Sequence, residues 1–270
     1  MKGKVVLIIG ASSGIGKACA VQLSKEGYTV FGTSRKKEKL ETDIIDGQIV
    51  WFLPMDVTVP NTIQQGVSQI IHLKGKIDVL IYSAGINVAG PIEETDDSEA
   101  LLQFDVNFFG AFRVVKTIIP YMRENKNGLI IFISSLAGEF GLPFQAFYSA
   151  SKAAINNFAE ALQMECPFLK VVVIEPGDCN TYLPDNRIIV KGHNIDSSFY
   201  KNFQTVIRKQ EYFERHGDDP KKIAQLVSKI VKNPSRIYYR IGKNVKLFSI
   251  LGKTLPRTVV IKQIVKHYGV

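Results

Sequence analysis

A tyrosine and a lysine lie four positions apart in "FYSASK", residues 147–152. Residues four apart on a helix share one face, with Cβ atoms roughly 5 to 6 Å apart. The ammonium of Lys152 would therefore stabilise the ionised phenol and lower the pKa of Tyr148, which is roughly 10 in a free side chain. A tyrosine tuned in this way can serve as an acid or a base. On an ordinary surface helix the same spacing has no chemical meaning, so the rest of the chain must decide.

A glycine-rich turn occurs near the start of the chain. The segment "GASSGIG", residues 10–16, joins the apolar run Val5–Ile9 to a helical pattern. Gly10 would allow a tight turn, Gly14 would leave room for a pyrophosphate, and Gly16 would let the helix approach the sheet. The N–H groups and dipole at the start of that helix favour phosphates. The turn predicts a dinucleotide site, which would also include Ser12, Ser13 and Ile15.

The second apolar run, "YTVFGTS", ends in basic residues. Enzymes that use NAD usually place Asp or Glu here to bind the ribose 2′-hydroxyl. This chain has Ser34, Arg35 and Lys36 instead, and no acid from residue 33 to residue 37. The fork-shaped guanidinium of Arg35 suits a 2′-phosphate. The sequence therefore favours NADP, as NADPH, over NAD.

Seven short apolar runs alternate with helical patterns along the chain. These runs are rich in Val and Ile and show little polar alternation, which is typical of strands buried on both faces of a parallel sheet. The alternation predicts an α/β fold in one domain over residues 1–270, with a doubly wound parallel sheet of about seven strands and helices on both faces. The segment 182–217 interrupts this rhythm beyond the carboxyl end of a strand, where a substrate lid is expected.

Several motifs, in matching order and spacing, resemble the short-chain dehydrogenase/reductase superfamily, in its single-domain branch with G-x-x-x-G-x-G and Y-x-x-x-K. The likeness is strong over residues 4 to about 182 and looser beyond, and it implies a Rossmann-type fold. The matching segments are "GASSGIG", "MDV" (55–57), "SAG" (83–85), "DVNFFG" (105–110), "ISS" (133–135), "YSASK" (148–152) and "PGDCNT" (176–181).

The resemblance assigns a catalytic role to Asn107, Ser135, Tyr148 and Lys152. Tyr148 would protonate the carbonyl oxygen during reduction and accept the proton in reverse, while Ser135 would hydrogen-bond the same oxygen. Lys152 would bind the nicotinamide ribose and tune Tyr148. Asn107 would hold a water that links Lys152 to solvent. No chemical role is expected for the neighbouring Ser134.

The resemblance also implies cofactor contacts from several strand ends. One group would border the adenine, another would line the middle of the cofactor, and a third would hold the carboxamide end of the nicotinamide. These groups are Asp56 and Val57; Ser83, Ala84 and Gly85 with Tyr148 and Lys152; and Pro176, Gly177 and Thr181. Two departures from the family pattern, Ile9 before the first glycine and Tyr82-Ser83 before Ala-Gly, are expected to alter hydrogen bonds between strands rather than the reaction.

The leading hypothesis is an NADP-dependent oxidoreductase that interconverts a carbonyl and an alcohol. The resemblance, which includes a C-terminal extension, implies a lipophilic substrate, such as a steroid, a retinoid or an acyl-lipid ketone, and the lid segment carries several apolar residues. An alternative is a non-catalytic dinucleotide-binding sensor or scaffold, although the complete Asn–Ser–Tyr–Lys set argues against it. A third reading, an extended-branch epimerase or dehydratase, disagrees with the glycine pattern and the chain length.

The formal net charge is +9, and all of the excess lies near the C-terminus. Nine Lys or Arg and no acid occur from Lys232 onward, including the basic extension at 243–270. After Pro256 the residues Val260, Ile264 and Tyr268 form one apolar stripe. This stripe predicts either a helix that packs on its own domain or peripheral contact with an anionic membrane. No nucleic-acid-binding module is recognisable.

Three scattered cysteines and four histidines give no disulfide framework and no metal site. This favours a reducing, cytoplasmic location, with membrane contact only at the periphery. The apolar run in "MKGKVVLIIG" is too short for an export signal and is interpreted as a strand. A broad apolar surface over residues 101–122 favours a homodimer or homotetramer.

Overall fold

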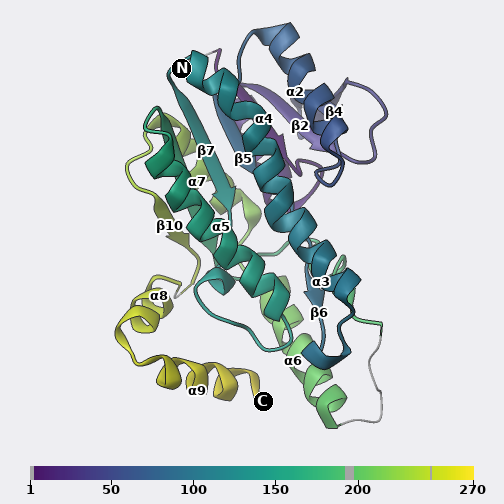
Figure 1. Cartoon of the computed structure of the whole chain (residues 1–270), viewed down its shortest axis with the longest axis vertical. Helices are drawn as coiled ribbons and strands as arrows, with labels where there is room; N and C mark the ends of the chain where they lie inside the picture. The colour runs from purple at the N-terminus through teal and green to yellow at the C-terminus, as the bar shows by residue number, and fades with distance from the viewer. Residues whose placement is uncertain (1–2, 192–197, 244) are drawn as a thin grey trace.

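A mostly parallel eight-stranded sheet forms the centre of the computed structural model, which describes residues 3–191, 198–243 and 245–270 (Figure 1). The strand order is β10-β8-β7-β5-β1-β2-β4-β3. The strands are β1 (Val5–Ile9), β2 (Thr29–Ser34), β3 (Glu41–Ile45), β4 (Gln48–Pro54), β5 (Val79–Tyr82), β7 (Gly128–Ile133), β8 (Leu169–Pro176) and β10 (Tyr238–Ile241). The predicted α/β class, the doubly wound sheet and the seven predicted strands are confirmed.

The eighth strand, β3, corrects the expected count of about seven. It pairs antiparallel with β4 at the edge of the sheet. The turn between them is Asp46-Gly47, and both residues have positive φ, 48° and 74°. This matches a two-residue hairpin of the primed type, for which Asp-Gly is a strong sequence signal. The strand was missed because three of its five residues, Glu41 to Asp43, are polar and it lies at an exposed edge, where Ile44 is 77% exposed.

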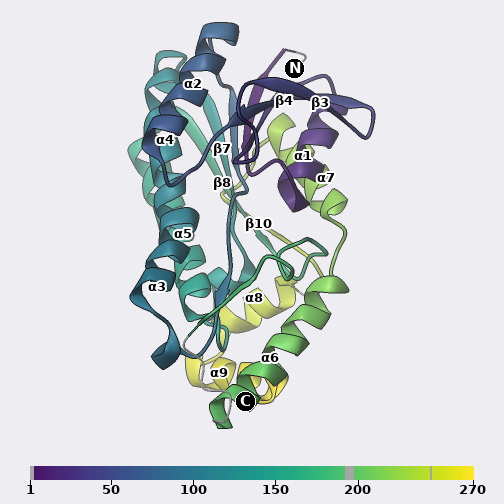
Figure 2. The same ribbon diagram turned by 90° about the vertical axis from the view of Figure 1, so that its right-hand side faces the viewer.

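Helices cover both faces of the sheet (Figure 2). On one face lie α1 (Gly14–Lys25) and α7 (Pro220–Lys232); on the other lie α2 (Pro60–Lys74), α4 (Gly110–Glu124) and α5 (Ala146–Glu165). Successive side chains of a strand point to opposite faces, so β1 supplies both layers. Leu7 and Ile9 join the core under α2, α4 and α5, whereas Val6 and Ile8 join the core under α1 and α7. The strands are apolar throughout because neither face meets water.

The strand order reverses direction at β1. From there the chain builds outward to β2 and β4, then returns to add β5, β7, β8 and β10 on the other side. Such a switch point leaves a crevice at the carboxyl ends of the strands, where ligands bind in open α/β sheets. Gly10 and Ser83 follow β1 and β5 there, and the Ser83 N–H donates to the Ile9 carbonyl over 3.0 Å. The glycine turn therefore lies at this switch point.

The expected lid segment is more regular than its sequence suggested. It contains β9 (Ile188–Ile189), which pairs parallel with β6 (Val88–Ala89), and the long helix α6 (Ser198–Arg215). Residues 192–197 of the segment lie outside the described residues. Gln210 of α6 accepts a hydrogen bond from the Gln145 amide over 2.5 Å. α6 is thus anchored to the loop that precedes α5.

The remaining short elements surround the same end of the sheet. α3 (Asp97–Phe104) continues through the π-helical turn η2 (Asp105–Phe109) into α4. The turns η1 (Ile92–Glu94) and η3 (Leu136–Gly138) follow β6 and β7 respectively. Capping at Asp96 fixes the start of α3, because its side chain and that of Glu99 bind each other's backbone N–H groups.

The C-terminal extension forms α8 (Val245–Thr254) and α9 (Arg257–Tyr268), which lie against α6 at the lower end of the molecule (Figure 1). Val260 is buried, and Ile264 and Tyr268 are half-buried. The His267 ring stacks on Phe213 of α6 with ring centroids 5.1 Å apart. The apolar stripe predicted after Pro256 therefore packs on its own chain rather than facing outward.

Candidate active site

Ser135, Tyr148 and Lys152 meet at the carboxyl end of the sheet. Ser135 follows β7, and its hydroxyl hydrogen-bonds the Tyr148 phenol. Tyr148 lies in the first turn of α5, and the Lys152 ammonium lies one turn later, 5.7 Å from the Tyr148 ring centroid. The same ammonium donates a 3.0 Å hydrogen bond to the Ile133 carbonyl. The four-residue spacing thus places both groups on one helix face, as the sequence predicted.

Burial, rather than the neighbouring ammonium, controls the pKa of the phenol. Burial raises the pKa of Tyr148 to about 12, and the hydrogen bond from Ser135 only partly opposes this. Burial likewise lowers the pKa of Lys152 to about 8. In this arrangement burial outweighs any lowering of the Tyr148 pKa by Lys152. Spacing alone does not reveal that both groups are buried, and burial disfavours the charged form of each.

Asn107 lies in the π-helical turn η2, a backbone irregularity that recurs at functional sites. Its side-chain oxygen accepts from the Ile86 N–H over 2.9 Å, and its nitrogen donates to the Ser151 hydroxyl over 3.0 Å. A Cβ on Gly85 would lie 3.4 Å from the Asn107 oxygen and 3.7 Å from the Lys152 nitrogen. Both groups therefore lie within ordinary contact distance of the backbone at Gly85.

The departure at Tyr82 supports this turn. Its buried hydroxyl donates to the Val106 carbonyl over 2.6 Å. A Cβ on Gly110 would lie 2.5 Å from that hydroxyl oxygen, so glycine is needed there. Burial raises the pKa of Tyr82, which stays protonated as a donor. Tyr82 therefore stabilises the backbone beside Asn107, a contact between β5 and a helix rather than between strands.

The glycine turn has the shape of a phosphate cradle. Gly10 has φ of +80°, and a Cβ on it would lie 2.9 Å from the Ala84 backbone. A Cβ on Gly16 would lie 2.2 Å from the Gly10 carbonyl oxygen. α1 begins at Gly14, and no side chain caps it at Ser13. The helix start therefore presents its N–H groups and positive dipole to a ligand, which fits the pyrophosphate of a dinucleotide.

The basic residues predicted to read the cofactor lie at the carboxyl end of β2. Ser34 is buried and accepts a 3.2 Å hydrogen bond from the Lys36 N–H, while the Arg35 and Lys36 side chains are exposed. Lys37, the next residue, forms ion pairs with Glu41 and Asp43 of β3. The hairpin thus engages Lys37 and leaves Arg35 and Lys36 exposed at the strand end.

The other predicted cofactor residues also lie at strand ends. After β4, the Asp56 carboxylate accepts 2.9 and 2.7 Å hydrogen bonds from the Thr58 N–H and hydroxyl, and Val57 is buried. After β8, the Gly177 N–H donates to the Ile241 carbonyl over 2.9 Å. The Thr181 side chain lies 3.4 Å from where a Cβ on Gly14 would be. Pro176 ends β8, and the segment that follows it thus approaches the glycine turn.

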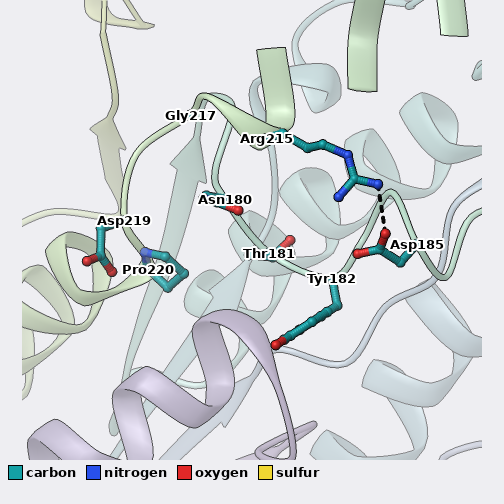
Figure 3. Close-up of a pocket in the computed structure, with 8 residues that line it drawn as sticks. All are labelled: Asn180, Thr181, Tyr182, Asp185, Arg215, Gly217, Asp219 and Pro220. Atoms are coloured by element: carbon teal, nitrogen blue, oxygen red, sulfur yellow. Dashed lines mark hydrogen bonds and ion pairs between the residues drawn. The ribbon is translucent and has the colours of Figure 1, made fainter. Parts of the chain in front are cut away.

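A polar hollow of about 440 Å³ opens beyond Thr181 (Figure 3). The segment after β8 and the end of α6 line it together, and an ion pair of 2.7 Å between Asp185 and Arg215 forms part of its wall. None of Ser135, Tyr148 and Lys152 lines this hollow. It adjoins the glycine turn and does not contain these three predicted catalytic residues.

A family model described as short chain dehydrogenase matches residues 4–188. The chain belongs to the short-chain dehydrogenase family. The 3-ketodihydrosphingosine reductase of Bacteroides thetaiotaomicron is 41% identical over 87% of this chain and 86% of its own. Retinol dehydrogenase 8 of Bos taurus is 31% identical over 84% of this chain and 78% of its own. A solved short-chain dehydrogenase of Streptomyces avermitilis superposes with a TM-score of 0.80 at 26% identity, covering 100% of this chain and 97% of that one.

Family membership makes this dehydrogenase an oxidoreductase that binds a nicotinamide dinucleotide. The structure also brings Ser151, which the sequence analysis did not single out, into contact with Asn107 and Tyr148. The Ser151 hydroxyl accepts from Asn107 and donates to the Tyr148 carbonyl over 2.8 Å. Its position three residues after Tyr148, on the same helix face, was the available signal. Ser134 donates to Asn156 over 2.8 Å and thus has the structural role expected of it.

The lowered pKa of Lys152 predicts a pH-dependent stability for the dehydrogenase. Between about pH 8 and its unfolded pKa near 10.5, the unfolded state binds more protons at this residue, so stability rises with pH. The free energy of unfolding of wild type minus that of Lys152→Met should rise by about 2 to 3 kcal/mol between pH 7 and pH 10. Urea denaturation of both proteins across this range measures it.

The informative quantity is the difference in the free energy of unfolding between wild type and Lys152→Met. Burial raises the pKa of Cys19 and of Cys179 to about 12, and both thiols therefore lower stability above about pH 9 in either protein. A difference that stays flat from pH 7 to pH 10 would mean that Lys152 keeps an ordinary pKa in the folded chain.

Proposed function

We propose that this dehydrogenase reduces a ketone on a lipophilic substrate to a secondary alcohol with NADPH. The observation that carries the proposal is the joining of Ser135, Tyr148 and Lys152 beside the glycine cradle, with Asn107 anchored to the same backbone. The reduced nicotinamide would supply hydride to the carbonyl carbon. The residues of the chain would bind and orient the reactants and deliver the proton.

Tyr148 has the properties of the proton donor. A raised pKa keeps the phenol protonated at neutral pH, as an acid for reduction requires. Ser135, already hydrogen-bonded to the phenol, would donate a second hydrogen bond to the carbonyl oxygen as negative charge develops on it. Lys152 would contact the nicotinamide ribose and replace the proton that leaves Tyr148. Asn107 would hold the water that connects Lys152 to solvent.

The selection of NADP rests on Arg35 and Lys36. Both side chains are exposed at the end of β2, next to the glycine turn, and the Gly10 N–H donates to the Thr33 hydroxyl over 3.2 Å. A 2′-phosphate on the adenine ribose would meet the guanidinium of Arg35 with two parallel hydrogen bonds. The nearest acids on β3, Glu41 and Asp43, are engaged by Lys37 and would not repel it.

The substrate class is supported by the relatives and by the lid. The names of the two relatives specify 3-ketodihydrosphingosine and retinol as substrates. In this chain the lid segment 182–217 carries the buried apolar residues Val190 and Phe203, and the Phe203 ring packs against Phe144 with centroids 5.4 Å apart. A panel of ketones of increasing chain length, followed by loss of NADPH absorbance, tests the class. Equal catalytic efficiency for short polar and long apolar ketones would exclude a lipophilic substrate.

Self-association would occur through the surface of α3 and α4. Leu101, Leu102, Phe109 and Phe112 are exposed there, and Met164 of α5 is 77% exposed. The exposed apolar residues of α3, η2 and α4 offer a surface that a second copy could cover in a symmetric dimer. A monomer by light scattering at micromolar concentration would contradict this proposal.

Peripheral contact with an anionic membrane would occur through the outer surface of α8 and α9, here called the C-terminal apolar face. Eight large apolar side chains are exposed in α8, α9 and the residues next to them: Phe248, Ile250, Leu251, Leu255, Val259, Ile261, Val265 and Val270. Exposed bases surround them, among them Lys246, Arg257 and Lys262, and the chain has no acid after Asp219. Among the described residues, no helix is long and apolar enough to cross a bilayer.

Charge distinguishes a membrane from a second copy at this face. A two-fold interface brings identical patches together, and here it would oppose basic residues to basic residues without any acid between them. An anionic bilayer offers both an apolar interior and compensating charge. The inner side of α9 packs on α6, so docking would place the lid region at the lipid surface.

Vesicle sedimentation tests the membrane contact. Wild type should sediment with vesicles of phosphatidylglycerol and phosphatidylcholine at low salt and remain in solution at high salt. The Phe248→Ser/Ile250→Ser double variant should lose sedimentation. The control Ile44→Ser/Ile49→Ser, which removes two exposed apolar residues at the other end of the molecule, should keep it. No sedimentation of wild type at low salt, or loss in both variants, would contradict the contact.

A further inference from the structure

The side chain of Asn87 is fully buried and makes no hydrogen bond. Its exposure is 0%, and among the described residues neither the amide oxygen nor the amide nitrogen has a partner. Its backbone carbonyl, in contrast, accepts a 2.8 Å hydrogen bond from the Ile188 N–H. A buried amide without partners is unfavourable, and in folded proteins such groups are uncommon outside functional sites. The amide of Asn87 therefore marks a place for a ligand.

The backbone on either side of Asn87 connects the catalytic group to the lid. Ile86 precedes it, and both backbone groups of Ile86 are hydrogen-bonded to the Asn107 side chain, at 2.9 and 3.2 Å. Val88 follows it and pairs with Ile188 in the parallel ladder of β6 and β9. This register places Asn87 beside Arg187, the residue before Ile188, with both side chains on the same face of the ladder.

Arg187 and Glu214 form an ion pair next to this amide. The Arg187 side chain is 3% exposed, and its terminal nitrogen donates to both Glu214 carboxylate oxygens, over 2.6 and 2.7 Å. The Nε of Arg187 is buried and has no hydrogen-bond partner within residues 3–191, 198–243 and 245–270. Both charges also act on the pKa of Tyr148, which Glu214 raises and Arg187 lowers, after the larger effects of burial and Ser135. The pair therefore lies near the catalytic phenol.

We propose that Asn87 and Arg187 form a polar subsite that binds a hydroxyl group of the substrate, close to the ketone that Tyr148 protonates. The inference rests on the proposed ketone reduction. A hydroxyl matches the unpartnered atoms because it donates to the Asn87 oxygen and accepts from the Asn87 amide or the Arg187 Nε–H. An ammonium would leave both donors unsatisfied, and a carboxylate would be repelled by Glu214. The substrate is thus a lipophilic ketone that carries a nearby hydroxyl.

Matched ketones test the subsite. The set contains long-chain α-hydroxy and β-hydroxy ketones and the plain ketone of equal length. Wild type should prefer one hydroxy ketone by roughly 100-fold or more in kcat/KM, because the plain ketone leaves buried polar groups unpaired. Asn87→Leu, similar in size and apolar, should reduce this preference at least tenfold and leave kcat/KM for the plain ketone within a few-fold. The NADPH dissociation constant should not change.

The stability of the chain without ligands gives a second, independent readout. Asn87→Leu removes a buried amide that has no partner, so its melting temperature should rise. The control Asn156→Leu removes a buried amide that binds Ser134 and Glu175, at 2.8 and 2.9 Å, and should lower the melting temperature. A fall in melting temperature for Asn87→Leu would assign Asn87 a structural role and overturn the proposal.

Other outcomes would separate a failure of the proposed subsite from a failure of the proposed function. Equal losses of kcat/KM for hydroxy and plain ketones, or weaker NADPH binding by Asn87→Leu, would place the amide at the cofactor or in the fold and overturn the subsite. A wild-type enzyme that turns over the plain ketone as well as both hydroxy ketones would do the same. Failure of wild type to reduce any ketone would instead overturn the proposed function, while the melting temperatures would still report whether the amide lacks a partner.

Discussion

Replacing Tyr148 by Phe is expected to lower kcat by roughly 1,000-fold or more, while the NADPH dissociation constant changes by no more than a few-fold. General acid catalysis contributes on the order of 100- to 10,000-fold, and the phenol is the group proposed to supply the proton. The ring is buried and packs in the same way in both proteins, so the site should keep its shape. Steady-state rates of NADPH oxidation and a fluorescence titration with NADPH measure the two quantities.

The control for this substitution is Tyr121→Phe. Tyr121 lies on α4 and packs against the core without contacting the catalytic group. The Tyr121→Phe variant also loses one phenol hydroxyl, and we expect it to keep the activity of wild type. Retention of more than a tenth of the wild-type kcat by Tyr148→Phe would remove Tyr148 from the role of proton donor and leave Ser135 or a water to supply the proton.

Replacing Arg35 by Asp is expected to change the cofactor preference by roughly 100- to 1,000-fold toward NADH. A charge-assisted hydrogen bond to the 2′-phosphate is worth about 1.5 to 3 kcal/mol, and the new carboxylate adds repulsion of the phosphate while offering acceptors to a 2′-hydroxyl. The ratio of kcat/KM with NADPH to that with NADH measures this change. Most of it should appear in KM, because Arg35 lies far from the reacting atoms.

Lys39→Asp provides the matched control for this change. It alters the net charge equally at an exposed position four residues further along, in the turn before β3. The ratio of kcat/KM with NADPH to that with NADH should remain within a few-fold of wild type in Lys39→Asp, since exposed charges at a distance are screened by salt. An unchanged ratio for Arg35→Asp would mean that Ser12 or Lys36 reads the 2′-phosphate instead.

The sequence was most informative where local spacing determines geometry. The glycines at 10, 14 and 16 specify a strand, a tight turn and a helix, because a Cβ at Gly10 or Gly16 would clash with nearby backbone and Gly14 has a positive φ. The four-residue step from Tyr148 to Lys152 specifies one helix face. Short apolar runs specify strands buried on both faces, and the parallel sheet follows from them. These features depend on neighbours within a few residues, so a single chain can reveal them.

Features that depend on packing between distant segments could not be read in this way. The pKa of Tyr148 is set by burial, which spacing does not report. Asn87 and Arg187 are 100 positions apart, and only the pairing of β6 with β9 brings them together. The apolar stripe of Val260, Ile264 and Tyr268 correctly predicted a helix. The direction in which that stripe faces depended on α6, which is far away in the sequence.

The central claim is that this dehydrogenase reduces a lipophilic ketone at a site where Tyr148 supplies the proton. Incubation of the enzyme with a long-chain ketone and NADPH that carries deuterium at the reactive nicotinamide position tests it most directly, with mass spectrometry of the product as the readout. We expect one secondary alcohol per NADPH consumed, with one deuterium on the former carbonyl carbon, and no such product from Tyr148→Phe on the same timescale. Stoichiometric binding of NADPH without any labelled alcohol, across the whole panel of ketones, would contradict the claim and favour the non-catalytic sensor or scaffold.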